Sequence, residues 1–227
     1  MAPVDRATRE QRRAQQQQPR QEVQIDPKIL DDYVGFYQLS EFAVFTVTRT
    51  GDNLHVQLTG QPAFQVYPES SRKFFYKVVH AQVAFVTDPQ GRATELVLHQ
   101  NGLERPAQRI DQAKAMEAEA SLARKVKEAT PTPGSEAALR RQIEAFQQGR
   151  PAYGGMSEEL AAVTVPQIPG IERQFAALGA LQSLSFRGVG AQGWDVYEAK
   201  FENGISICRI FLAANGKVSG LLFQWGP

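Results

Sequence analysis

Cysteine is nearly absent from this sequence, which contains Cys208 alone. One cysteine excludes an internal disulfide and a zinc site built from cysteines. A free thiol is common in the cytosol, but a buried thiol also persists in an oxidising compartment, so the cysteine count leaves the compartment open. The three histidines, His55, His80 and His99, lack the Asp or Glu pattern that accompanies a metal centre. We therefore expect neither a metal nor a cofactor.

A strong net charge and a long apolar run are also missing. The formal charge is +1 over 227 residues, which gives no field to attract nucleic acid or an anionic membrane. No apolar run approaches the roughly 18 residues of a membrane-spanning helix. The N-terminus has no apolar signal-peptide core. We expect no nucleic-acid partner, no membrane span and no export signal in this stretch.

Residues 1–24 are rich in Arg and Gln and almost free of apolar residues. Such a segment has little with which to offset the entropy of ordering, so we predict a disordered tail. A basic arm for nucleic acid is the alternative. Asp5, Glu10 and Glu22 dilute its charge, and it has no aromatic residue for base stacking.

Residues 25–111 have the pattern of short strands broken by turns. Asp26 and Pro27 predict a short helix, since Asp is a good N-cap and Pro fits the first helical position. Alternating apolar residues predict the strand segments 43–47, 54–58, 64–66, 74–79, 83–87 and 94–100. Turn chemistry stands at 50–53, 88–91 and 101–102. This spacing predicts an all-β antiparallel barrel whose interior is either filled or open to a small ligand.

Residues 112–134 predict a helix and a linker. Ala, Glu and Lys dominate from Ala113 to Ala129, and the Pro-containing run from Thr130 to Gly134 ends the helix. We place the boundary between two modules in that run.

Residues 135–227 predict a small α+β module, with helices packed on a four-stranded antiparallel meander. Ser135 is the expected N-cap of the first helix, Ser157 begins another, and Gly179 ends a third. The predicted strands are 181–189, 194–201, 205–212 and 218–225, with hairpin signals at Asn203-Gly204 and Asn215-Gly216.

Several motifs in the first module resemble those of a known family. They are Tyr33-Val-Gly-Phe-Tyr37, Leu58-Thr-Gly-Gln-Pro62, Tyr67-Pro-Glu-Ser70, Lys73-Phe-Phe-Tyr76, Leu98-His-Gln-Asn-Gly102 and Ala107-Gln-Arg-Ile110. Together they resemble the lipocalin-like domain that follows the catalytic domain in bacterial β-lactamase-related serine hydrolases. This resemblance implies an accessory module, and a periplasmic location if the chain is a fragment of an exported hydrolase.

The second module resembles a small cystatin-like or nuclear-transport-factor-like domain found downstream of that lipocalin-like domain. The motifs are Leu178-Gly-Ala-Leu181, Gly193-Trp-Asp-Val-Tyr197, Phe201-Glu-Asn-Gly204 and Gly216-Lys-Val-Ser-Gly220. Folds of the nuclear-transport-factor type often contain an open cone with an acidic residue inside, so the resemblance implies a pocket.

Ser70-Ser-Arg-Lys73 fits the Ser-x-x-Lys pattern of penicillin-binding proteins. In those enzymes the serine opens a helix, so that Ser and Lys meet one turn apart. Here a strand is predicted after Lys73, and residues three apart on a strand point to opposite faces. Lys-Thr-Gly and Ser-Asp-Asn partner motifs are absent. We expect no catalytic residue, and we expect Cys208 to be a buried structural thiol.

Turn chemistry also predicts the register of the last three strands. A two-residue turn at Asn203-Gly204 pairs Ala199 with Cys208 and Glu198 with Arg209, and a like turn at Asn215-Gly216 pairs Cys208 with Phe223. One face then carries the apolar side chains, including Cys208, and packs on Phe146, Phe175 and Leu178.

Asp195 and Tyr197 fall on that same apolar face. A buried Asp195 needs a partner, and Ser219 is the nearest by register. The three residues are candidate ligand-binding residues. An acid–tyrosine pair could also abstract a proton, with the carboxylate as base and the phenol stabilising an oxyanion. The alternative is a structural pair with no chemistry.

These observations lead to one main hypothesis and two rivals. The main hypothesis is a non-catalytic accessory unit of a serine hydrolase, for assembly, substrate gating, or binding of a small apolar or peptide ligand. Its partner would be the hydrolase catalytic domain or that ligand. The rivals are an enzyme with a pocket at Asp195 and Tyr197, and a protein-interaction scaffold with exposed apolar patches. The sequence leaves the oligomeric state open.

Overall fold

A computed structural model describes residues 11, 14 and 19–226. The described chain forms two compact units, which divide between Ser121 and Leu122. This division lies inside the stretch 112–134 that the sequence assigned to a helix and a linker. Lys125 and Thr132 contact Gly193 and Asp195, which attaches the residues after 121 to the second unit.

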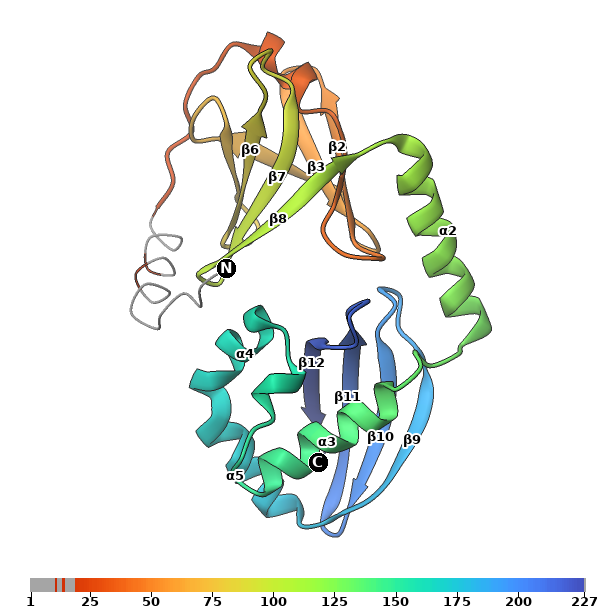
Figure 1. Ribbon diagram of the computed structural model, residues 1–227. Helices are drawn as coiled ribbons and strands as arrows, with labels where there is room; N and C mark the ends of the chain where they lie inside the picture. The colour runs from red at the N-terminus through yellow and green to blue at the C-terminus, as the bar shows by residue number, and fades with distance from the viewer. Residues whose placement is uncertain (1–10, 12–13, 15–18, 227) are drawn as a thin grey trace. The chain divides into compact units, whose positions relative to one another are not determined.

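The first unit is a closed antiparallel barrel of eight strands in sequential order. The alternation predicted an antiparallel barrel with six of these strands, and the strands at 35–38 and 103–110 were not predicted. Figure 1 shows its strands curling around one axis. A 3₁₀ helix, η1, precedes the barrel. The elements are η1 (Pro27–Asp32), β1 (Gly35–Gln38), β2 (Val44–Thr50), β3 (Asn53–Leu58), β4 (Phe64–Pro68), β5 (Lys73–Tyr76), β6 (Ala81–Thr87), β7 (Ala93–Gln100) and β8 (Leu103–Ile110).

Apolar side chains occupy the barrel interior. Tyr33 stacks on Phe85 with ring centroids 4.4 Å apart, and Phe74 meets both rings edge-on. Leu30 of η1 and Tyr37 of β1 belong to the same buried cluster. Of the two interiors that the sequence left open, the structure has the filled one.

Arg109 of β8 ties one end of the barrel together. Its guanidinium donates to the carbonyl oxygens of Asp32, Val34 and Ala93, and to the Tyr37 hydroxyl at 3.2 Å. A Cβ added at Gly35 would lie 2.8 Å from the Arg109 guanidinium, and Gly35 has φ +151. A glycine is therefore required where β1 passes this side chain.

Residues 20–25, most of which belong to the stretch predicted as a disordered tail, contact the barrel. Arg20 forms an ion pair with Glu69 at 2.7 Å, and the Val23 N–H donates to the Pro68 carbonyl at 2.9 Å. The charged side chains find partners on the barrel, which composition alone does not reveal. Most of residues 1–18 lie outside the described part of the chain, so the prediction for them is untested.

The second unit packs helices on a four-stranded antiparallel sheet in the order β12-β11-β10-β9. Helix α2 (Gln112–Glu128) leads into it, and Ala115 and Ala118 at its start pack on the barrel strands. The other elements are α3 (Ser135–Gln147), η2 (Tyr153–Gly155), α4 (Glu158–Thr164), η3 (Val165–Gln167), α5 (Ile168–Leu178), β9 (Leu181–Val189), β10 (Asp195–Phe201), β11 (Gly204–Leu212) and β12 (Val218–Trp225).

One face of the sheet is covered by helices, as Figure 1 shows for α3 and α5. Phe146 of α3 and Phe175 of α5 stack with centroids 5.9 Å apart, and Phe223 of β12 meets both rings edge-on. Leu178 and Cys208 lie in the same cluster, and Cys208 is fully buried. The predicted packing of this face and the predicted burial of Cys208 are both confirmed.

The predicted register of β10 and β11 is wrong by two residues. Phe201 pairs with Gly204, and Tyr197 rather than Ala199 pairs with Cys208. Glu202 and Asn203 form the turn because the end of α5 holds them. The Asn203 N–H donates to the Leu178 carbonyl at 2.9 Å, and the Glu202 N–H to the Ala180 carbonyl at 3.1 Å. A shift of two keeps every side chain on its predicted face.

The predicted pairing of β11 with β12 is confirmed in part. Cys208 pairs with Phe223 as predicted. Near the turn, Leu212 pairs with Val218 across a register shift, so Ser219 is an extra residue at a bulge.

No helix in the part of the chain that the structure describes is long and apolar enough to span a membrane.

Candidate functional site

Asp195, at the start of β10, is 1% exposed and has its partners within the second unit. Its Oδ2 accepts the Thr132 N–H at 2.8 Å, and the Lys125 Nζ lies 3.1 Å from Oδ1. This second contact is an ion pair without the geometry of a directed hydrogen bond, because Oδ1 has no hydrogen-bond partner. The Lys125 ammonium donates to the Thr132 hydroxyl and the Gly193 carbonyl, each at 2.7 Å. The carboxylate therefore anchors the end of α2 and the loop after it.

Tyr197 lies two residues further along β10, on the same face. Its hydroxyl shares a hydrogen bond with the Ser135 hydroxyl at 2.7 Å, and both side chains are buried. Burial raises the pKa of Tyr197, the Ser135 hydrogen bond lowers it, and the charges of Asp195 and Glu136 raise it further. A phenol with a raised pKa stays protonated and can donate a hydrogen bond at neutral pH.

A shallow groove of about 620 Å³ opens beside Tyr197. The loop at 131–134 forms one wall, and the exposed side of α3 forms the other with Arg140, Arg141 and Glu144. Asp195 is not among the lining residues. Asp195 and Tyr197 are thus neighbours on one strand, but only Tyr197 reaches this groove.

Ser219 lies elsewhere. It is exposed on β12, and its hydroxyl donates to the Phe211 carbonyl at 3.4 Å. Lys125 and Thr132, rather than Ser219, are the partners of Asp195. The predicted Glu198–Arg209 pairing is also wrong.

Glu198 forms an ion pair with Arg187 of β9 at 2.8 Å. The Arg209 guanidinium donates to the Gln224 side chain of β12 at 3.3 Å. The two-residue register shift places Arg209 opposite Val196 instead of Glu198.

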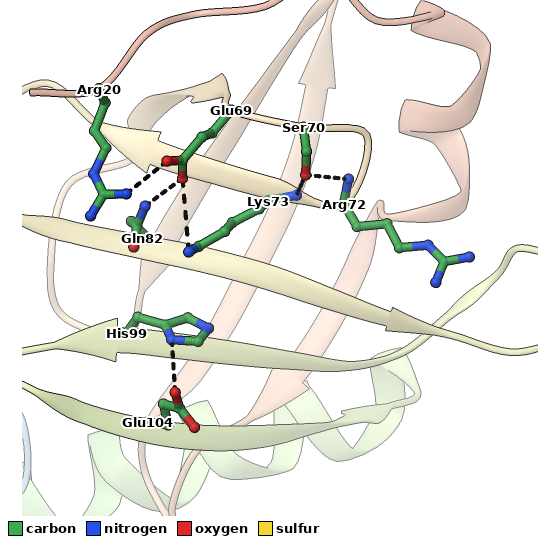
Figure 2. Close-up of polar contacts among 8 residues, drawn as sticks. All are labelled: Arg20, Glu69, Ser70, Arg72, Lys73, Gln82, His99 and Glu104. Atoms are coloured by element: carbon green, nitrogen blue, oxygen red, sulfur yellow. Dashed lines mark hydrogen bonds and ion pairs between the residues drawn. The ribbon is translucent and has the colours of Figure 1, made fainter. Parts of the chain in front are cut away.

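The Ser-x-x-Lys motif of the barrel runs from the turn at Ser70 to Lys73, the first residue of β5, and Figure 2 shows its side chains. The Ser70 hydroxyl accepts the backbone N–H groups of Arg72 at 3.4 Å and Lys73 at 3.2 Å. The Lys73 ammonium instead lies 3.9 Å from Glu69. Ser70 and the Lys73 ammonium are therefore not joined as a nucleophile and its base would be.

The histidines and Cys208 are the remaining candidate groups. No group of three potential metal-binding side chains occurs among the residues that the structure describes. His99 lies 3.6 Å from Glu104, on neighbouring strands (Figure 2). Burial raises the pKa of the Cys208 thiol to about 11, against a lowering by its contact with Ser206, so the thiolate is scarce at neutral pH.

Three residues of these networks were not predicted from the sequence. Lys125 looks like an ordinary surface lysine of a helix, and Thr132 lies in a Pro-rich linker. Ser135 was predicted as an N-cap, but Gly134 holds the cap position and the Ser135 side chain turns to Tyr197. One signal in the sequence could have pointed to these partners. Asp195 falls on the buried face of its strand, and a buried carboxylate needs a cation, which here comes from outside the sheet.

Two comparisons with known proteins found a match, and the family match covers the barrel. Residues 19–116 match the model of a family described as a domain of unknown function, DUF3471. Penicillin-binding protein 4* of Bacillus subtilis (strain 168) is 31% identical over 85 residues, which are 37% of this chain and 19% of that protein. No solved structure matches the chain. The similarity is weak and partial, and it is consistent with the C-terminal region of a β-lactamase-related serine hydrolase.

Proposed function

We propose that this chain is a non-catalytic accessory unit of a β-lactamase-related serine hydrolase, acting in assembly, substrate gating or binding of a small apolar or peptide ligand. The observation that supports it best is the partial similarity of the chain to penicillin-binding protein 4*. The hydrolase catalytic domain would be its partner.

The barrel chemistry supports a non-catalytic role. Ser70 is held by backbone N–H groups in a turn, and the Lys73 ammonium is directed to Glu69. Neither arrangement activates a hydroxyl for attack.

The descriptions of the barrel as lipocalin-like and of the second module as cystatin-like are part of the same proposal. Eight antiparallel strands in sequential order support the name lipocalin-like for the barrel, since lipocalins are up-and-down barrels of this size. Helices on one face of a four-stranded antiparallel sheet support the cystatin-like description of the second module. Because the barrel interior is filled, a ligand would bind outside it.

The test is in two parts. A fluorophosphonate or β-lactam probe should leave the mass of the chain unchanged, with Ser70→Ala as the matched control. The purified chain should also bind the separate catalytic domain of a related hydrolase and change its kcat/KM. Acylation of Ser70, or no effect on any such catalytic domain, would contradict the proposal.

A ligand site in the second unit is the second candidate, with Asp195, Tyr197 and Ser219 as the residues first considered. The groove beside Tyr197 favours it, whereas the ion pair of Asp195 with Lys125 and the distant hydrogen bond of Ser219 do not. Tyr197→Phe should weaken ligand binding while Ser219→Ala leaves it unchanged, as measured by calorimetry with candidate peptides. An enzyme would also show turnover that Asp195→Asn abolishes without unfolding the chain.

The scaffold alternative draws support from the uncovered face of the sheet, where Leu222 is 54% and Ile205 41% exposed. Such side chains on an open sheet face favour protein contact.

A further inference from the structure

The segment at 19–25, here called the strap, contacts the outside of the barrel in three different ways. The Arg20 guanidinium donates to Glu69 Oε1 at 2.7 Å. The Val23 N–H donates to the Pro68 carbonyl at 2.9 Å, and Lys77 Nζ donates to Glu22 Oε2 at 2.9 Å. Ile25 packs against the barrel core. One extended segment thus presents a guanidinium, a carboxylate and a backbone N–H to three separate groups.

The barrel side of these contacts is held in place by its own neighbours, as Figure 2 shows for Glu69. Glu69 Oε2 accepts the Gln82 side-chain amide and lies 3.9 Å from the Lys73 ammonium, which leaves Oε1 for Arg20. Gln82 is only 2% exposed. A carboxylate oriented by a buried amide is arranged to receive a guanidinium, because charge-assisted hydrogen bonds depend on such geometry.

Two further residues complete the surface. Lys77 lies over the ring of Tyr67, with Nζ 3.4 Å from the ring centroid, and this contact positions the ammonium for Glu22. Phe75 is 6% exposed although its neighbour Phe74 fills the barrel core, so strand alternation directs Phe75 outward. The Phe75 ring lies 5.9 Å, centroid to centroid, from the ring of Tyr67 on the neighbouring strand β4.

We propose that Tyr67, the Pro68 carbonyl, Glu69, Lys77 and Gln82 form a peptide-binding site on the outside of the barrel, here called the strap site. It takes an extended segment with an arginine, an acidic residue two positions later and a free backbone N–H at the next position. Arg20, Glu22 and Val23 of the strap occupy it in cis. A segment of the same chemistry from another polypeptide binds once the strap is displaced.

Because the strap already occupies the site, it competes with a free peptide and lowers the affinity measured for that peptide. A tethered segment competes at an effective concentration on the order of millimolar for a short flexible linker. A free peptide should therefore bind the unaltered chain poorly and bind a chain with a weakened strap well. This site rests on the peptide-binding form of the proposed accessory role, and its failure would leave assembly with the catalytic domain and substrate gating untouched.

The experiment uses a fluorescent peptide with the sequence of residues 19–25 and the full chain carrying Arg20→Ala and Glu22→Ala. Fluorescence anisotropy should give at least tenfold tighter binding to this double variant than to the unaltered chain. Adding Glu69→Gln to the double variant should reduce the affinity at least tenfold, because the guanidinium loses its carboxylate. Asp52→Asn in place of Glu69→Gln is the matched control, since it removes an exposed carboxylate of the same barrel and should change nothing.

A change in the peptide tests the same contact without altering the fold. Replacing its arginine by alanine should reduce affinity for the double variant at least tenfold, and far-UV circular dichroism confirms that each protein variant is folded. Equal affinity of the unaltered chain and the double variant would overturn the proposal, as would no binding to either. Equal affinity of the double variant for the arginine peptide and the alanine peptide would also overturn the proposal.

Discussion

The two units satisfy their buried polar groups by different means. In the barrel, Arg109 serves backbone carbonyls and the Tyr37 hydroxyl, so its partners are neutral groups. In the second unit, Asp195 is buried against the Lys125 ammonium. Neutral acceptors tolerate the loss of one donor, whereas a buried carboxylate and ammonium each depend on the other. The second unit should therefore be the more sensitive to a single substitution in its polar network.

The largest effect is expected for Asp195→Ala. It removes the buried carboxylate that lies 3.1 Å from the Lys125 ammonium, whose side chain is 15% exposed. Breaking a buried ion pair costs about 3–5 kcal/mol. Because Lys125 is partly exposed, we expect the loss of unfolding free energy to be at the lower end, about 3 kcal/mol. Both tryptophans, Trp194 and Trp225, lie in the second unit, so tryptophan fluorescence during urea unfolding reports on this unit alone.

Two controls sharpen this result. Glu198→Ala breaks the exposed Arg187 pair and should cost at most about 1 kcal/mol. Combining Asp195→Asn with Lys125→Met removes both charges and should recover most of the loss. A loss of under 1 kcal/mol for Asp195→Ala would show that the two units do not differ in this respect.

A somewhat smaller effect is expected at alkaline pH, where the units should weaken in different pH ranges. Burial raises the pKa of Cys208 from 9.0 to about 11, and burial raises that of Tyr37 from 10.0 to about 12 against a lowering by Arg109. The folded state keeps these protons longer than the unfolded state, so stability falls as pH rises. The second unit should be unaffected below pH 9 and lose stability towards pH 11, and the barrel should do so between pH 10 and about 12.

For each group this raised pKa corresponds to a loss of no more than about 3 kcal/mol. Urea midpoints by tryptophan fluorescence follow the second unit, and Cys208→Ala should flatten its pH profile between pH 9 and 10, above which Tyr197 also titrates. Far-UV circular dichroism includes the barrel, where Tyr37→Phe should make the loss above pH 10 smaller, because burial also raises the pKa values of Tyr33 and Tyr76. Identical profiles for both units, unchanged by either substitution, would remove this difference.

Two Asn-Gly dipeptides show which parts of the fold the sequence could predict. At Asn101-Gly102 both residues have positive φ, 54° and 77°, and Gln100 pairs with Leu103 as the dipeptide predicted. At Asn203-Gly204 the same dipeptide misled, because contacts with the end of α5 fix Glu202 and Asn203 as the turn. Local turn chemistry decides register only where no packed neighbour competes for the same backbone groups.

The candidate site was less predictable for the same reason. Alternation placed Asp195 and Tyr197 on the buried face of β10, and this was confirmed. Their partners come from α2, the loop at 131–134 and α3, and no strand register could identify them. Likewise, composition predicted a disordered tail where Arg20 meets Glu69, because that carboxylate is 49 residues away in the sequence.

The smallest expected effect concerns the turns at Asn101-Gly102 and Asn203-Gly204. Gly102→Ala places a Cβ on a residue at φ 77°, a left-handed conformation that costs an L-residue about 1–2 kcal/mol. In Gly204→Ala the new Cβ would meet only the Leu178 Cδ2 atom, at 2.9 Å, and that flexible side chain can move. We expect Gly102→Ala to lower the barrel's unfolding free energy by about 1 kcal/mol. For Gly204→Ala we expect a loss of at most about 0.5 kcal/mol from the second unit, since its turn is held by α5 rather than by the glycine.

Urea unfolding followed by far-UV circular dichroism and by tryptophan fluorescence measures the two losses separately. A larger loss for Gly204→Ala would mean that this glycine, and not the end of α5, sets the β10–β11 turn.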